Sequence, residues 1–374
     1  MREWPNNELL GLLGIDHPII QAPMSGLTTP ALAAAVSNAG GVGSLGCAEM
    51  SDQQLREQFD ATRSSTSRPF NLNFFAHDIP KYPTDGVATM RERLAIYYEE
   101  LGLGRVADLS PSTMRSFDEA TSETVLELRP DIVSFHFGLP AQEIVDALKS
   151  TGTIILCSAT TVAEARQLET AGVHAIIAQG YDAGGHRGTF GKPLEAGNVG
   201  TFSLVPQVAD AVSVPVIAAG GIADGRGIAA AFALGASGVQ MGTAFLLCPE
   251  SAASGLYREA LRQVRDDGTR LTRAFTGRPA RAIVNRFVEE MATYEREAAP
   301  FPLQDSLTLP LHIRSEERGS VDFAALLSGQ AAPLCRALPA GELIDLLVAE
   351  AQSVFESAYR GSRIIGNKGG DVPA

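Results

Sequence analysis

Short apolar runs recur between His17 and Met241, and most are followed by a segment whose apolar residues have helical spacing. Apolar runs bounded by glycine, proline or polar residues are typical of buried parallel strands. The pattern predicts eight strands, at 17–21, 42–45, 70–75, 131–135, 153–157, 175–179, 215–219 and 238–241. It predicts helices at 31–38, 51–62, 85–102, 141–149, 161–170, 201–211 and 225–234, with an irregular excursion at 102–123.

Strands that alternate with helices indicate parallel crossovers, which are right-handed β-α-β units. Eight of them favour a closed barrel over an open doubly wound sheet. We therefore predict an α/β fold in which residues 1–248 form a (β/α)8 TIM barrel.

The pattern changes after Cys248, and residues 249–374 are predicted to form a C-terminal helical segment that packs over the barrel mouth as a cap. The last dozen residues are expected to be disordered. Within this segment we predict helices at 251–264, 323–327 and 338–359, a connecting element at 278–286, and an extended proline-rich stretch at 299–313.

Composition narrows the class of protein. The chain has 374 residues, of which 45% are hydrophobic and 20% charged, and a net charge of -13 without a basic run, so no nucleic-acid partner is expected. No stretch is long and apolar enough for a membrane span, and the N-terminus lacks the apolar core of a signal peptide. The four cysteines are scattered, which is typical of buried thiols in a reducing compartment, so a cytoplasmic location is expected.

Polar and glycine residues stand where the predicted strands end, the face that carries the active site in such barrels. Gly220 and Gly221 follow the seventh strand, and Gly242 and Thr243 follow the eighth, where backbone N–H groups commonly hold a phosphate. Amides at other strand ends suit the polar edge of a flavin, and an apolar wall suits its ring. The absence of a GxGxxG after the first strand disfavours a dinucleotide and favours FMN. The remaining strand-end residues in this prediction are Ala22, Pro23, Met24, Asn73, Gln179, Gln240 and Met241.

The stretch after the sixth strand, AQGYDAGGHRG, is typical of an active-site rim. Gly184 and Gly185 allow a close approach of the backbone, and His186 titrates near neutral pH. His136 ends the fourth strand and is expected at the same mouth, where it either faces the substrate or orients a loop. Arg187 contacts the site or pairs with a surface carboxylate. The six histidines have no HxH or HxxxH spacing, so no metal site is expected.

Several stretches resemble the nitronate monooxygenase family, formerly called 2-nitropropane dioxygenases, and its class I branch in particular. They are QAPMSGLTTPALAAAVSNAGGVGSLG, FNLNFF, VSFHFGLP, QGYDAGGHRGTF, AAGGIADGRGIAAAFALGASGVQMGTAFL and GRPARAIVNRF, within Leu13 to Phe287. The resemblance implies non-covalent FMN and one-electron oxidation of alkyl nitronates by O2 to a carbonyl compound and nitrite. Propionate 3-nitronate is the best-known class I substrate.

The resemblance also implies roles for single residues. His186 matches the catalytic histidine, which takes the α-proton of a neutral nitroalkane or orients a nitronate, and His136 matches a second, substrate-side histidine. Ala22 to Met24 line the flavin ring. The positions that match FMN contacts are Asn73, Gln179, Gly184, Gly221, Gln240, Met241, Gly242 and Thr243.

The chain departs from the class I pattern at Phe301 and Leu309, where the resemblance implies tyrosines and a lysine. This departure predicts a more apolar substrate pocket. Two alternatives stay open: an FMN-dependent reductase of quinones or enoyl thioesters fed by NAD(P)H, and a flavin-binding protein without catalysis. The expected partners are a small-molecule nitronate and O2; the oligomeric state is open, with a homodimer among the alternatives.

Overall fold

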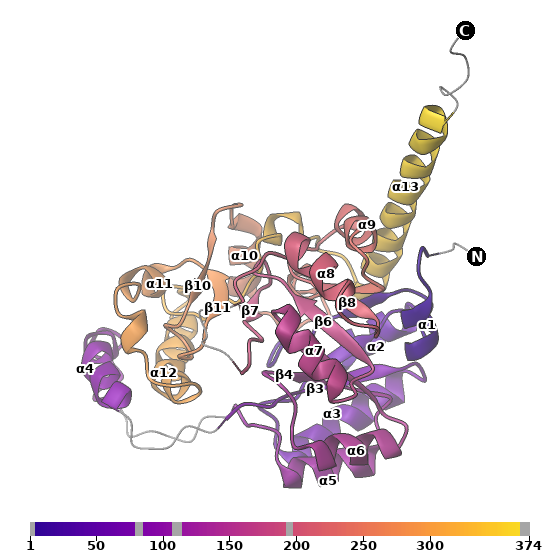
Figure 1. Ribbon diagram of the computed structural model, residues 1–374. Coiled ribbons are helices and arrows are strands. Elements are labelled where there is room, and N and C mark those ends of the chain that lie inside the picture. Colours follow the sequence, from indigo (N-terminus) through magenta and orange to yellow (C-terminus); the bar gives the residue numbers. More distant parts are fainter. Residues whose placement is uncertain (1–3, 79–84, 107–113, 192–196, 367–374) are drawn as a thin grey trace.

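Eight parallel strands form the centre of the molecule (Figure 1). The computed structural model describes residues 4–78, 85–106, 114–191 and 197–366. The strands are β1 (Ile19–Gln21), β2 (Gly43–Gly46), β3 (Phe70–Phe75), β4 (Ile132–His136), β5 (Ile154–Ala159), β6 (Ala175–Gln179), β8 (Val216–Ala219) and β9 (Gly238–Met241). They are ordered β1-β9-β8-β6-β5-β4-β3-β2, and a parallel bridge between Ile20 and Val42 joins the two ends. The predicted TIM barrel is confirmed, and each predicted strand is present.

A ring of helices surrounds these strands. It consists of α2 (Pro30–Asn38), α3 (Asp52–Ser65), α5 (Glu119–Leu128), α6 (Gln142–Ser150), α7 (Val162–Thr170), α8 (Thr201–Ala209), α9 (Gly225–Ala233) and α13 (Ala340–Gly366). Side chains at the N-caps fix several starting points: Thr29 accepts from Leu32 N, and Ser51 forms a capping box with Gln54. The helix α5 begins inside the predicted irregular stretch, where Asp118 caps it.

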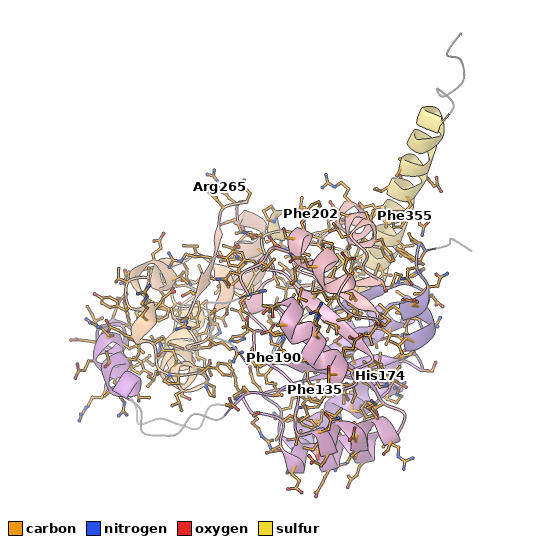
Figure 2. All side chains as sticks on the ribbon, viewed as in Figure 1. Phe135, His174, Phe190, Phe202, Arg265 and Phe355 are labelled. Atoms are coloured by element: carbon orange, nitrogen blue, oxygen red, sulfur yellow. The ribbon has the colours of Figure 1, made fainter. Side chains whose placement is uncertain are left out.

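Apolar side chains fill two layers. The strand faces that point outward pack against the helices, whereas Ile20, Ile177 and Ile217 fill the barrel interior near its base. The helix α1 (Glu8–Leu13) closes that base with Leu9, which is fully buried. Phe135 on β4 is fully buried, while Phe202 on α8 is 74% exposed; both are labelled in Figure 2. None of the helices within the described ranges combines the length and apolarity that a bilayer crossing requires.

A second lobe lies beside the barrel and comes from two distant stretches of chain (Figure 1). The helix α4 (Asp85–Glu100) follows β3, yet it packs against α12 (Leu303–Glu317). The other elements of this region are α10 (Gly255–Gln263), β10 (Thr269–Thr272), β11 (Ala280–Ile283), α11 (Arg286–Glu290) and short 3-10 turns at Thr243–Phe245, Glu295–Glu297 and Ala332–Leu334. The strand β11 pairs with β10 and with β7 (Gly185–His186), which is a strand that the sequence pattern did not predict.

Several expectations for the C-terminal segment are wrong. The stretch predicted as extended at 299–313 contains α12, in which Pro310 lies inside the helix. The helix tolerates this proline because Leu307 and Leu311 are buried in the apolar cluster that α4 also lines. Residues 323–327 are not helical, and Leu327 instead bridges to Ala282.

The C-terminal helix α13 lies outside the barrel rather than over its mouth. It contacts α9 and α2, so it fills the last position of the helical ring (Figure 1). The mouth is covered by elements of the second lobe, and the domain boundary at residue 248 stays a prediction. The last dozen residues are expected to be disordered, but those up to Gly366 belong to α13. Residues 367–374 lie outside the described residues.

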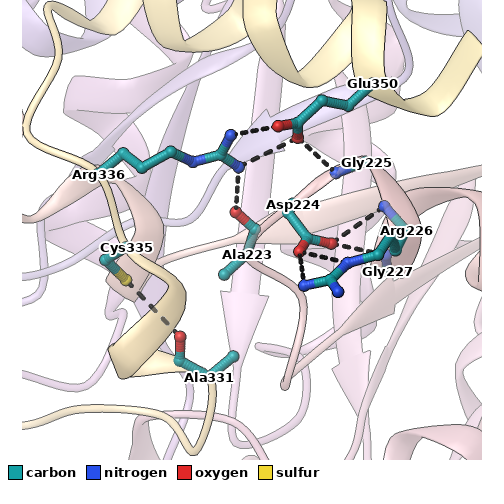
Figure 3. Close-up of polar contacts among 9 residues, drawn as sticks. All are labelled: Ala223, Asp224, Gly225, Arg226, Gly227, Ala331, Cys335, Arg336 and Glu350. Atoms are coloured by element: carbon teal, nitrogen blue, oxygen red, sulfur yellow. Dashed lines mark hydrogen bonds and ion pairs between the residues drawn. The ribbon is translucent and has the colours of Figure 1, made fainter. Parts of the chain in front are cut away.

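Glu350 joins α13 to the rest of the barrel (Figure 3). Its carboxylate accepts from Gly225 N at 3.0 Å, the first residue of α9, and from both terminal nitrogens of Arg336 at 2.5 and 3.2 Å. Arg336 also donates to Ala223 O at 3.1 Å. One carboxylate thus satisfies a free N–H at a helix start and a guanidinium at once.

We expect Glu350→Ala to lower the free energy of unfolding by about 1–2 kcal/mol, because the Gly225 N–H and the Arg336 guanidinium lose their acceptor. The midpoint of urea unfolding measures the change. Glu356→Ala, at an exposed position on the same helix, is the matched control and should leave the midpoint in place. Equal midpoints for the two variants would contradict the role of Glu350.

Candidate active site

A cavity of about 220 Å³ opens at the carboxyl ends of the barrel strands. Every residue that the sequence pattern assigned to the site lines this cavity. They are Ala22, Pro23, Met24, Asn73, His136, Gln179, Gly184, Gly185, His186, Gly220, Gly221, Gln240, Met241, Gly242 and Thr243. They come from six strand ends, and the barrel brings them together because parallel strands share one carboxyl edge. Their individual roles remain proposals.

The cavity has further walls that sequence reasoning missed. Glu49 follows β2 and Phe75 ends β3, so their positions at strand ends were the available signal. Leu327, Gly329 and Ala331 come from the C-terminal segment, and nothing local in their sequence marks them as site residues. Gly329 N donates to the Thr243 hydroxyl at 3.0 Å, which ties this segment to the strand end after β9.

Three contacts hold His186 in place. Its main-chain carbonyl accepts from Gln179 Nε2 at 2.9 Å and from His136 Nε2 at 3.1 Å. Its ring Nε2 lies 2.9 Å from the Thr276 hydroxyl. The ring Nδ1 has no hydrogen-bond partner within the described chain, and His186 lines the cavity.

Burial, together with charge repulsion from His136, Arg278 and His77, lowers the pKa of His186 to about 3. The imidazole is therefore neutral at physiological pH in this structure, as a proton acceptor must be.

His136 uses both ring nitrogens within the protein. A carbonyl can only accept, so Nε2 carries the proton in its bond to His186 O, and Nδ1 accepts from the Ser158 hydroxyl at 2.9 Å. Burial lowers the pKa of His136 to about 3. Of the two interpretations of this residue, these bonds favour the one in which it orients the loop that carries His186.

Gly188 is required for this arrangement, since a Cβ there would lie 2.7 Å from His136 Cε1. Gly184 has a similar constraint: a Cβ would meet Gly329 N at 2.5 Å. The close approach that Gly184 permits is therefore to the segment at 328–329 as well as to the cavity.

Arg187 is 1% exposed, so the alternative of a surface ion pair is wrong. Its guanidinium donates to the carbonyls of Gln179 at 3.0 Å, Gly180 at 2.5 Å and Gly197 at 2.8 Å. Burial lowers its pKa to about 10, which leaves it charged at neutral pH. The buried cation locks the turn that leads from β6 to His186.

An apolar cluster adjoins the histidine. Phe301 lies 5.5 Å from His186 and 5.4 Å from Phe137 between ring centroids, and the Arg278 guanidinium lies 3.7 Å from the centre of the Phe137 ring. Phe301 therefore contributes to an apolar environment around His186 without lining the cavity, and the more apolar substrate pocket stays a prediction. Leu309 is on α12 and does not line the cavity.

Glycines and one buried amide without a hydrogen-bond partner line the part of the cavity that is formed by the ends of β8 and β9. Gly220 and Gly221 have φ of 107° and 70°, which side chains rarely adopt. Gln240 Oε1 is buried and has no hydrogen-bond partner. Thr243 accepts from Gly329 N, so its own hydroxyl proton stays available. Within residues 4–366 as far as they are described, no cluster of three metal-binding side chains occurs.

Sequence and structure comparisons agree on one family. The sequence profile described as nitronate monooxygenase matches residues 6–350. A nitronate monooxygenase from Paraburkholderia phytofirmans is 44% identical over 355 residues, covering 93% of this chain and 96% of the relative. The chain belongs to the nitronate monooxygenase family.

Solved structures extend this relation. The nitroalkane oxidase from Streptomyces ansochromogenes matches with a TM-score of 0.87 at 38% identity, covering 94% of this chain and 99% of that one. FabK from Thermotoga maritima matches with a TM-score of 0.75 at 32% identity, covering 96% and 100%. The likeness in fold thus extends over nearly the whole chain.

In this member of the nitronate monooxygenase family, acid should reduce stability through the buried histidines. Burial lowers the pKa of His77 to about 4 and those of His136 and His186 to about 3, whereas the unfolded chain binds protons near pH 6.5. The unfolded state then takes up more protons as the pH falls below about 6.5, and the free energy of unfolding declines. We expect a loss of about 1 kcal/mol per histidine between pH 7.5 and 5.5.

Urea unfolding at the two pH values measures this loss. His136→Asn should show a smaller loss than the parent protein, whatever its stability at pH 7.5, because one of the histidines with a lowered pKa is gone. The same loss in parent and variant would exclude His136 as a source of the pH dependence.

Proposed function

We propose that the chain is an FMN-dependent enzyme that oxidises alkyl nitronates with O2 to a carbonyl compound and nitrite, and neutral nitroalkanes through prior proton removal by His186. Membership of the nitronate monooxygenase family supports the reaction class, as does the likeness to a nitroalkane oxidase. The observation that carries the proposal is a neutral, rigidly held His186 with one ring nitrogen left for a ligand.

The lining residues fit FMN. Gly220, Gly221, Gly242 and Thr243 would hold the phosphate with backbone N–H groups and a hydroxyl. Asn73 donates its amide protons to Ser134, so its Oδ1 would be an acceptor for an N–H of the flavin ring. Gln240 Oε1, buried without a partner, is a second such acceptor. Ala22, Pro23 and Met24 would support the ring.

Bound FMN would supply the electron-accepting chemistry, and the chain's own residues prepare the substrate. His186 Nδ1 takes the α-proton of a neutral nitroalkane, and its Nε2 stays bonded to Thr276. The buried Arg278 favours the negative charge that then develops on the nitro group, although it does not line the cavity. A substrate that is already a nitronate needs no proton transfer. His136 and Gln179 hold the His186 backbone throughout.

A second candidate uses the same barrel and cofactor with another electron donor: reduction of a quinone or enoyl thioester by NAD(P)H. The likeness to FabK keeps this alternative open. Fold alone does not separate the two reactions. A flavin-binding role without catalysis is the remaining alternative, against which the intact His186 arrangement argues.

Rapid anaerobic mixing of the flavin-loaded protein separates these candidates. We expect ethyl nitronate to bleach the flavin absorbance and NADH to leave it unchanged. In His186→Asn, the rate with nitroethane should fall about 100-fold relative to the rate with ethyl nitronate, the scale of a lost general base. Bleaching by NADH alone would favour the reductase, and equal rate ratios in parent and variant would remove His186 as the base.

The charges of the cavity indicate which nitronates it accepts. Among the residues that the structure describes, its lining contains one carboxylate, Glu49, and neither lysine nor arginine. Glu49 is exposed, so it lies at the entrance. A nitronate that carries a carboxylate meets like charge there and finds no cation for ion pairing among the described lining residues. We therefore propose that nitronates without a carboxylate are preferred.

Glu49→Gln should raise kcat/KM for propionate 3-nitronate about threefold relative to ethyl nitronate, because it removes one exposed like charge. The gain should shrink at 0.5 M salt, because the screening length between exposed charges is then about 4 Å. Steady-state rates with the two nitronates, at low and high salt, provide the measurement. An unchanged ratio at low salt would exclude Glu49 as a determinant of substrate charge.

A further inference from the structure

Thr276 is the only side chain that contacts the ring of His186 through a hydrogen bond in the described part of the chain. Its Oγ1 lies 2.9 Å from Nε2, and Thr276 and His186 are 4% and 9% exposed. Thr276 sits in the turn between β10 and β11 and does not line the cavity. It therefore touches the histidine from behind, on the side away from a ligand.

The position of one proton follows from the partners of this hydroxyl. Thr276 Oγ1 accepts from Arg278 N at 3.4 Å and donates to Arg278 O at 3.3 Å. A hydroxyl has a single proton, so once it is given to Arg278 O, the oxygen can only accept from His186 Nε2–H. In the opposite tautomer the hydroxyl would donate to Nε2, and the buried Arg278 carbonyl would lose this donor. Only the Nε2–H tautomer provides a hydrogen-bond partner for all four groups: the ring Nε2 of His186, the Thr276 hydroxyl, and the N–H and carbonyl of Arg278.

We propose that Thr276 is a positioning residue that holds His186 as the Nε2–H tautomer, so that the lone pair on Nδ1 is the acceptor for the α-proton of a neutral nitroalkane. In the other tautomer Nδ1 carries a proton and cannot act as a base. The bonds from Gln179 and His136 to the His186 carbonyl fix the backbone but leave the tautomer undetermined. This inference rests on the proposed function, because the base matters only for a substrate with a proton to remove.

Proton balance is simple in this scheme. The C–H bond of the nitroalkane breaks, its electron pair stays on the substrate as the nitronate, and the proton forms a new N–H bond at Nδ1. The product histidine is an imidazolium with both nitrogens protonated, still bonded to Thr276 through Nε2. A nitronate supplied directly bypasses this step, so the two substrates report differently on Thr276.

Thr276→Val, Thr276→Ser and the control Thr272→Val test the proposal. Thr272 is a buried threonine of β10 whose hydroxyl bonds to Glu295, away from His186. We expect Thr276→Val to lower the ratio of nitroethane to ethyl nitronate turnover about tenfold or more, and Thr276→Ser to restore it. Thr272→Val should leave the ratio as in the parent protein even where it lowers thermal stability.

A spectroscopic measurement tests the tautomer without reference to activity. The ¹⁵N chemical shifts of the His186 ring, assigned by their loss in His186→Asn, should show a protonated Nε2 in the parent protein and an increased Nδ1–H population in Thr276→Val. A protonated Nδ1 in the parent protein, or an unchanged turnover ratio in Thr276→Val, would overturn the proposal. Absence of both activities in the parent protein would instead overturn the proposed function, since the ring shifts report on the tautomer independently.

Discussion

The main-chain carbonyl of His186 accepts two hydrogen bonds, and the arrangement of the site depends on them. One comes from Gln179 at the end of β6 and the other from His136 at the end of β4. The same residue is paired through β7 with β11, in register with Ala280. A carbonyl has two lone pairs, so these bonds use its full capacity and join the ends of two barrel strands at a single atom, while the β7–β11 pairing links the same residue to the second lobe.

This junction explains how an irregular loop becomes a rigid site. A glycine-rich turn would ordinarily lose much conformational entropy on ordering. Here the cost is offset by bonds from three sides and by the buried Arg187, whose donors reach the successive carbonyls of Gln179 and Gly180 and the distant carbonyl of Gly197. The ring of His186 lines the cavity, and one of its nitrogens has no hydrogen-bond partner in the described chain. Rigid placement of a single acceptor is what proton abstraction from carbon requires.

Buried charge shapes the chemistry around the ring. Arg187, Arg278 and Arg281 are each at least nine-tenths buried, and their guanidinium groups bond mainly to main-chain carbonyls. The buried carboxylate of Glu164 faces them from α7, where it accepts from Thr160 N and Phe190 N. Among these charges, Arg278 lowers the pKa of both His136 and His186 and so opposes their protonation.

The second lobe adds walls to the cavity at the mouth of the barrel, on the side where the substrate is proposed to bind. Residues between β9 and α13 leave the barrel, supply β11, Thr276, Phe301 and Gly329, and return so that α13 takes the last place in the helical ring. The ion pair of Arg336 with Glu350 marks that return. A long excursion at this point adds cavity walls while the strand order of the barrel stays intact, which is how loops vary chemistry on this fold.

The amino-acid sequence by itself determined the barrel and the strand-end residues that are proposed to hold the cofactor. Strand and helix periodicity is local, and the carboxyl ends of parallel strands necessarily meet, so Asn73, Gln179, Gly221 and Thr243 could be assigned together. The substrate half was decided by tertiary structure. The pairing of β7 with β11, the helix over 303–317 despite Pro310, and the contact of Thr276 with His186 all join residues far apart in the chain. Their energies come from burial and hydrogen bonds that exist only after the second lobe packs onto the barrel, which no local pattern encodes.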